Sequence, residues 1–107
     1  MKIKLIAGIV CLLVWLTANA QATEVEWWHP FGGKNGEIVQ ELVDNFNAEH
    51  PGIVVKSIKK GGYADCLNGG IAAYRAGKAP ELLVVLGRDA PTLMTSGAVQ
   101  PVHKLMP

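Results

Sequence analysis

His29 has the most versatile side chain in this sequence, because an imidazole can act as a general base or contact a ligand. It ends the run Trp27-Trp28-His29. No serine, cysteine or carboxylate stands at a recognisable motif spacing beside it, so a structural or pocket-lip histidine is favoured over a catalytic one. Trp28 and His29 are therefore the candidate lip of a ligand cleft, although a buried first strand would show the same residues.

Glycines and lysines near this histidine suggest a second kind of chemistry, the binding of an anion. The segment Gly32-Gly33-Lys34-Asn35-Gly36 lacks the spacing of a P-loop and of a dinucleotide fingerprint, so it predicts a shaped turn and not a nucleotide site. Lys59 and Lys60 could attract an anionic ligand, and a solvated strand end explains them equally well. Tyr63 follows two glycines and opens a helix, so its hydroxyl is expected at the same edge as these loops.

The charge and cysteine content exclude several other function classes. Once Lys2 and Lys4 are set aside with a leader, eight Lys and Arg residues face nine Asp and Glu residues, and no basic stripe remains. Nucleic acid is therefore not an expected partner. Cys66 is then the only cysteine, and no CxxC motif or His/Cys cluster accompanies it. We expect a buried apolar cysteine, no disulfide, no metal and no cofactor.

The amino-terminal residues have the pattern of an export signal. Lys2 and Lys4 precede an apolar run from Leu5 to Leu16, which is too short to span a bilayer. Small-residue cleavage patterns follow, and we expect cleavage after Ala22, with Ala20 as the alternative. Residues 1–22 are thus predicted to be a cleavable signal peptide, with an uncleaved anchor as the less favoured interpretation. Residues 23–107, about 85 in all, form the expected exported chain, which can enclose one small core.

These candidate residues must be positioned by an alternation of strands and helices. Apolar runs rich in β-branched residues predict strands, and apolar residues at helical spacing predict helices. The expected strands are 25–28, 53–58 and 81–86, the expected helices are 37–50 and 63–76, a short helix follows Asp89 with Pro91 in its first turn, and 99–106 forms an extended or weakly helical exit.

The order strand–helix–strand–helix–strand–helix predicts the α/β class. Short connections and right-handed crossovers give a three-layer α/β/α arrangement around a short parallel sheet. Ligands of such sheets lie beyond the carboxyl ends of the strands. Three loops should therefore share that edge, and they are His29 to Gly36, Lys59 to Tyr63 and Gly87 to Asp89.

Several runs make the sequence similar to one known family. They include Trp28-His29 after an export signal, Phe46 to Pro51, Gly62-Tyr63 and, most discriminating, the run from Gly70 to Pro80. The chain resembles the extracellular solute-binding proteins of bacterial ABC importers over essentially all of the exported part. The family has two lobes that close on the ligand like a hinged clamp. The resemblance implies that residues 23–107 are the start of the first lobe of a type II periplasmic-binding-protein fold, and hence an amino-terminal fragment.

The resemblance also implies site residues and partners. Tyr63 matches a tyrosine that contacts the ligand, whereas Gly87 stands where the family has an acidic ligand contact, so the acceptor there is lost. The implied ligand is sn-glycerol 3-phosphate or a glycerophosphodiester, captured in the periplasm and passed to the membrane permease subunits of the importer. A binding protein of this kind performs no chemistry, and weak binding is expected from the present chain. Two alternatives stay open: a small secreted α/β hydrolase that uses His29 with Asp65 or Asp89, and a non-functional truncated remnant.

Overall fold

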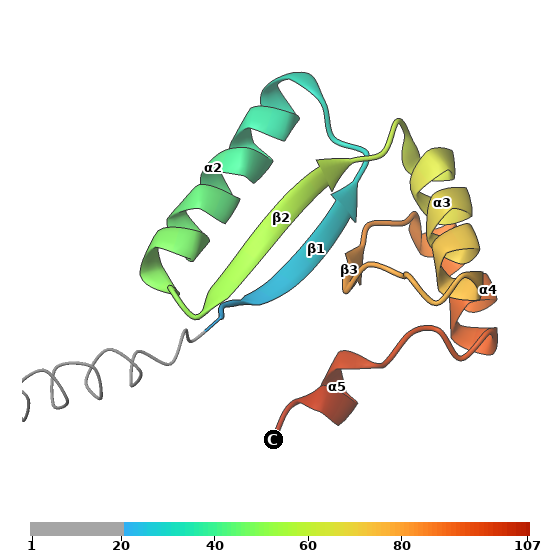
Figure 1. Cartoon of the computed structure of the whole chain (residues 1–107). Coiled ribbons are helices and arrows are strands. Elements are labelled where there is room, and N and C mark those ends of the chain that lie inside the picture. The colour runs from blue at the N-terminus through green and yellow to red at the C-terminus, as the bar shows by residue number, and fades with distance from the viewer. Residues whose placement is uncertain (1–20) are drawn as a thin grey trace, which may run out of the picture.

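The computed structural model describes residues 21–107, which form a small open α/β unit (Figure 1). The predicted signal peptide lies almost wholly outside the described residues. The elements in chain order are β1 (Thr23–His29), α2 (Gly33–Glu49), β2 (Ile53–Lys59), α3 (Tyr63–Arg75), β3 (Leu82–Leu83), the 3-10 turn η1 (Gly87–Asp89), α4 (Ala90–Thr95) and α5 (Val102–Leu105). Among these elements there is no helix whose length and apolar character would let it cross a membrane.

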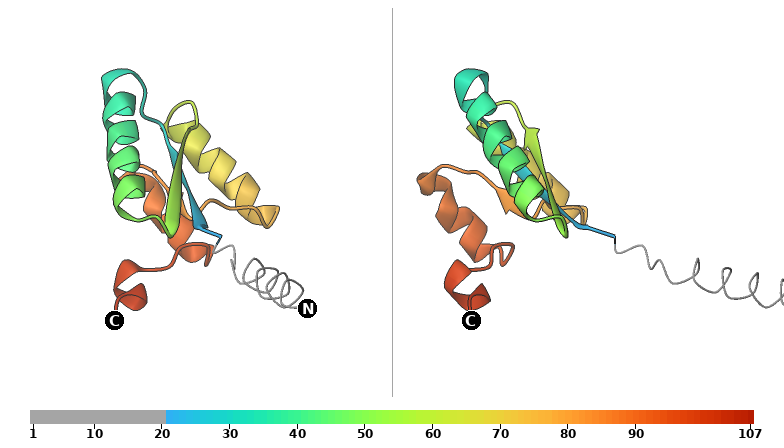
Figure 2. Two further views of the ribbon diagram at one scale, coloured as in Figure 1. Left: turned by 60° about the vertical axis from the view of Figure 1, so that its left-hand side comes forward. Right: turned by 90° about the vertical axis from the view of Figure 1, so that its left-hand side faces the viewer.

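The three strands form one parallel sheet in the order β2-β1-β3, as the α/β pattern predicts. Because the chain moves from β1 to β2 on one side and then returns past β1 to β3, right-handed crossovers place α2 and α3 on opposite faces. The views in Figure 1 and Figure 2 agree with this layering. The predicted α/β class and its short parallel sheet are confirmed.

Each long helix covers the sheet through a few small or apolar residues. Val39 and Val43 are the buried residues of α2. On the other face, α3 approaches the sheet at its paired glycines, because a Cβ on Gly70 would lie 2.5 Å from Leu83 Cδ2. The absence of a Cβ at these glycines permits the close packing, and that contact offsets their low helix propensity.

Two predicted boundaries are wrong. The first helix begins at Gly33 and not at Glu37, because the Gly36 N–H already donates to the Gly32 carbonyl at 3.2 Å and starts the helical ladder. The expected loop of Gly32 to Gly36 is therefore mostly the first turn of α2. The third strand is only Leu82–Leu83 and not 81–86. It has one neighbouring strand, and its last ladder bond is the one that Val84 N–H donates to the Trp28 carbonyl at 2.9 Å.

The short helix after β3 begins at the predicted position. Asp89 occupies the N-cap position of α4 and Pro91 lies in the first turn. The Asp89 side chain makes no capping hydrogen bond, because its backbone is already in the α region as the end of η1. The chain thus passes directly from one helical turn into the next.

Candidate functional site

The carboxyl edge of the sheet gathers four aromatic rings in a continuous row. Trp27 and His29 share one face of β1, because side chains two residues apart lie on the same side of a strand. The ring centroids are 5.7 Å apart for Trp27 and His29 and 5.7 Å for His29 and Phe31, and Phe31 meets Tyr63 at 6.3 Å edge to face. We call Trp27, His29, Phe31 and Tyr63 the aromatic row. It joins the end of β1 to the start of α3.

His29 is held inside this row and not presented to solvent. It is 4% exposed, and its Nδ1 accepts a hydrogen bond of 3.2 Å from the Phe31 backbone N–H. The neutral ring therefore carries its proton on Nε2. Burial lowers the pKa of His29, and the Lys59 ammonium on the paired strand lowers it further. His29 is thus a neutral ring that fixes the turn after β1.

This geometry predicts a pH dependence of stability. The folded-state pKa of His29 lies below its unfolded value, so the unfolded chain binds the proton more readily. The free energy of unfolding should be constant above the unfolded pKa of about 6.5 and fall as the pH is lowered toward 5. Urea denaturation at several pH values measures this. In His29→Asn, which keeps a polar side chain, the slope between pH 6.5 and 5 should disappear, and an unchanged slope would assign it to other groups.

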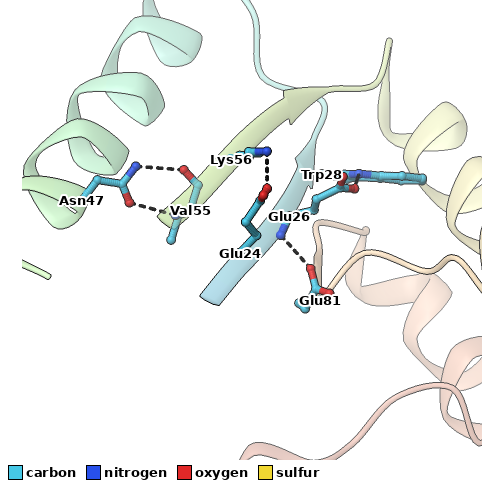
Figure 3. A network of polar contacts seen from close by, with 7 residues as sticks. All are labelled: Glu24, Glu26, Trp28, Asn47, Val55, Lys56 and Glu81. Carbon is cyan, nitrogen blue, oxygen red and sulfur yellow. Dashed lines mark hydrogen bonds and ion pairs between the residues drawn. The ribbon is translucent and has the colours of Figure 1, made fainter. Parts of the chain in front are cut away.

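Trp28 points to the opposite face of β1 and packs under α3. Its ring is 9% exposed, a Cβ on Gly69 would lie 3.8 Å from Trp28 Cζ3, and its Nε1–H donates to Glu26 Oε2 at 2.9 Å (Figure 3). The Lys60 ammonium lies 3.9 Å from the ring centroid. Of the two tryptophans, which alternation alone could not distinguish, Trp28 is the buried one. The exposed part of the candidate cleft lip is formed by Phe31 and Tyr63 instead.

Tyr63 is positioned by the turn that precedes α3. Gly62 N–H donates to Asp65 Oδ2 at 2.8 Å, and Cys66 Sγ lies 3.7 Å from the Lys60 carbonyl. Cys66 is fully buried, and burial followed by the nearby Asp65 carboxylate raises the pKa of its thiol. These contacts fix the turn and leave the Tyr63 ring 38% exposed at the edge. Cys66 is the buried apolar cysteine that the sequence predicts.

Positive charge accompanies the aromatic row at this edge. The Lys59 side chain runs past the start of α2, since a Cβ on Gly32 would lie 2.9 Å from Lys59 Cε. Lys34 pairs with Glu37 at 3.1 Å, whereas Lys59 has no carboxylate partner among residues 21–107. An anion at this edge would therefore meet an ammonium group that has no competing carboxylate.

Gly87 lies in η1, after the shortened third strand. Apart from its chain neighbours and the backbone of its own helical turn, no atom lies within 4 Å of the position that a Cβ would take there. A side chain can therefore be introduced at residue 87 without a clash. The structure shows no contact between Gly87 and the aromatic row, and the ligand roles of Tyr63 and residue 87 stay predictions.

The hydrogen bonds around His29 do not favour a hydrolase that uses this residue. Asp65 is occupied by the Gly62 amide, Asp89 lies 3.9 Å from Arg88, and His29 Nδ1 is taken by a backbone amide. No serine or cysteine lies in hydrogen-bond contact with the His29 ring among the described residues. Residues 21–107 also contain no group of three metal-ligating side chains.

Sequence reasoning missed Phe31 as part of the site. Its ring links His29 to Tyr63 and, with Asn35, Ile38 and Val39, lines a shallow hollow of about 190 Å³. The signal was present in the alternation Trp27, His29, Phe31, which continues the strand pattern through Pro30. Phe31 was overlooked because a loop was expected from His29 to Gly36.

A short open parallel sheet with helices on both faces is consistent with a partial α/β periplasmic binding domain. No protein-family model matches the chain. It is homologous, however, to curated proteins named sn-glycerol-3-phosphate-binding periplasmic protein UgpB. It is 42% identical to the one from Pectobacterium atrosepticum over 91 residues, which cover 84% of this chain and 20% of that protein. The resemblance inferred from the sequence is confirmed as a match to a fragment of this solute-binding protein.

Further relatives give the same result. The chain is 39% identical to the protein of Yersinia pestis over 99 residues, which are 90% of this chain and 23% of the relative. It is 41% identical to that of Escherichia coli over 98 residues, which are 91% of this chain and 22% of the relative. The chain thus spans about a fifth of the length of the curated relatives it matches. These relatives are named as binding proteins of the periplasm and not as enzymes.

Proposed function

We propose that this chain is part of the substrate-binding component of an ABC importer that captures sn-glycerol 3-phosphate or a glycerophosphodiester. The observation that carries the proposal is the similarity of about 90% of the chain to proteins named for glycerol 3-phosphate binding. The importer's membrane permease is the proposed partner, and the periplasm, reached through cleavage of residues 1–22, is the proposed location. Residues 23–107 are the proposed part of the first lobe.

The carboxyl edge of the sheet supports this ligand class. Tyr63 exposes its ring there and can offer its phenolic O–H to a ligand oxygen. The Lys59 ammonium and the amino-terminal ends of α2 and α3 provide positive potential beside it. In this arrangement Tyr63 contacts the ligand, and residue 87 is the position where an acidic side chain would accept from ligand hydroxyls.

The described residues supply only one side of such a site, so weak binding is the expected result. Titration calorimetry of the exported chain with sn-glycerol 3-phosphate should give a Kd no tighter than about 1 mM, or about −4 kcal/mol. Gly87→Glu should tighten the Kd by about tenfold, because a carboxylate acceptor adds about 1.5 kcal/mol through charged hydrogen bonds. Because the space beside residue 87 is open, the new glutamate side chain would not displace its neighbours.

The controls separate the ligand contact from general effects. Gly87→Gln has nearly the same size without the charge and should gain less than Gly87→Glu. Tyr63→Ala introduced into Gly87→Glu should abolish the gain, whereas Lys78→Glu, an exposed charge change away from the carboxyl edge, should leave it intact. A Kd that no substitution at residue 87 or Tyr63 alters would contradict the proposed site. Micromolar binding by the unaltered chain would contradict the half-site argument.

A further inference from the structure

The dipeptide Asn-Gly occurs twice in the sequence, at Asn35-Gly36 and at Asn68-Gly69. An asparagine before a glycine is prone to spontaneous deamidation, because glycine has no Cβ to keep its backbone nitrogen away from the preceding side chain. Asn35 and Asn68 are both exposed to solvent. Sequence and exposure therefore do not distinguish the two sites, and any difference between them must come from the fold.

Deamidation requires the glycine nitrogen to reach the asparagine side chain. The nitrogen attacks the side-chain carbonyl carbon, the new C–N bond closes a succinimide ring, and the side-chain nitrogen leaves as ammonia with the proton that the glycine nitrogen loses. Water then opens the ring at either carbonyl and gives aspartate or isoaspartate. A regular helix blocks the attack, because a ψ of about −42° and the hydrogen bond to residue i−4 hold the glycine nitrogen away from that carbonyl.

Asn35-Gly36 lies in the irregular first turn of α2. Gly33, the first residue of this helix, has a φ of 53°, which lies outside the right-handed helical region. The N-cap residue Gly32 has no side chain that could accept from the first-turn amides. The Gly36 N–H reaches the Gly32 carbonyl only at 3.2 Å, the long end of the usual range. This turn should therefore open more readily than a helix interior.

Asn68-Gly69 lies in the interior of α3, at a place where this helix packs on the sheet. A Cβ on Gly69 would lie 3.8 Å from Trp28 Cζ3, so the helix backbone faces the indole ring there. The next residue, Gly70, is buried against Leu83. The Gly69 nitrogen could leave the helical ladder only if α3 moved away from β1 and β3, so opening at this site costs more than fraying of the first turn of α2.

We propose that Asn35 is a site of spontaneous deamidation in the folded protein and that its place in α3 protects Asn68. The reaction would change the carboxyl edge of the sheet. Asn35 lines the shallow hollow together with Phe31 of the aromatic row, and the first turn of α2 contains no acidic residue. Aspartate at residue 35 adds a negative charge to the edge that carries the Lys59 ammonium, and isoaspartate also inserts a methylene into the backbone.

Peptide mapping by mass spectrometry tests this proposal without any ligand. The chain, purified after export, is incubated at neutral pH in water labelled with heavy oxygen, which marks each new carboxylate. Deamidation at Asn35 should be at least about tenfold faster than at Asn68. The product should include isoaspartate, which direct hydrolysis of the side-chain amide cannot form. In urea concentrated enough to unfold the chain, the two sites should react at similar rates.

Two variants test the role of the first turn. Gly32→Ser supplies a hydroxyl acceptor at an extended N-cap residue, where the new Cβ would meet only the mobile end of the Lys59 side chain. It should slow deamidation of Asn35 about twofold and leave Asn68 unaltered. Asn35→Gln should nearly abolish the reaction at residue 35, because glutamine must close a larger ring. An unchanged rate in Gly32→Ser would contradict the role of the open first turn.

Three further outcomes overturn the proposal. One is deamidation at equal rates at Asn35 and Asn68 in the folded chain. Another is a folded chain in which Asn35 stays intact under conditions where a peptide of the same sequence reacts. A third is a preference for Asn35 that persists undiminished in urea, which would assign it to the local sequence and not to the fold. Because no ligand is present in any of these measurements, their failure leaves the proposed ligand site untouched.

Discussion

Replacing Trp28 with alanine is expected to lower the free energy of unfolding by about 3–5 kcal/mol, the cost of truncating a buried aromatic side chain. Trp28 is the largest buried side chain of the described residues, and it lies where β1, α3 and the Lys60 turn meet. The substitution removes the packing against Gly69, the hydrogen bond to Glu26 and the contact with the Lys60 ammonium. Since small domains have only about 5–15 kcal/mol in total, this loss removes a large fraction of the stability.

Urea denaturation, monitored by circular dichroism, measures this loss of stability. Trp28→Phe keeps a ring against Gly69 and loses the indole N–H, so it should cost less than Trp28→Ala. Met94→Ala truncates an apolar residue that is 65% exposed and should change stability by no more than about 0.5 kcal/mol. A Trp28→Ala loss below about 1 kcal/mol would mean that α3 is not packed on β1 in solution.

The element types could be predicted from the sequence, because they depend on local apolar periodicity. The stripe that includes Val39 and Val43 predicts α2, and the β-branched run from Ile53 predicts β2. The boundaries that fail depend on tertiary contacts. The start of α2 is fixed by a backbone hydrogen bond between Gly36 and Gly32, although the low helix propensity of glycine disfavours a helix there. The length of β3 is fixed by the number of strands that pair with it.

The same division holds for the candidate site. The sequence places Tyr63 at the carboxyl edge, because the topology brings the ends of parallel strands together. It could not assign the two tryptophans, since alternation separates their faces without saying which face α3 covers. The Nδ1 hydrogen bond that makes His29 a structural residue also depends on the path of the backbone after Pro30. That path has no periodic signal.

The two edges of the sheet differ. Asn47 of α2 closes the β2 edge by hydrogen bonds to the N–H and the carbonyl of Val55, whereas the β3 edge is an uncharged strand beside an apolar groove. The contrast also makes the role of Asn47 measurable, because its removal would open the edge that is now closed.

Replacing Asn47 with alanine is accordingly expected to cost about 2–4 kcal/mol. The side chain makes two part-buried hydrogen bonds to β2, one with the N–H and one with the carbonyl of Val55, and each partner left unpaired costs about 1–3 kcal/mol. Denaturation in urea gives the magnitude. Asn47→Asp should fall between alanine and the native residue, because its carboxylate still accepts from Val55 N–H and can no longer donate to the Val55 carbonyl.

The matched control for this prediction is Gln40→Ala. It removes the bond to Ser57 from the same helix, but that bond joins exposed side chains and satisfies no backbone group, so the expected cost is below about 1 kcal/mol. Asn47→Ala should also release the outward amide of Val55, whose hydrogen exchange should then quicken more than that of its neighbours in β2. Equal losses for Gln40→Ala and Asn47→Ala would contradict this prediction. They would show that the apolar stripe alone holds α2 on the sheet and that the Asn47 hydrogen bonds add nothing to the free energy of unfolding.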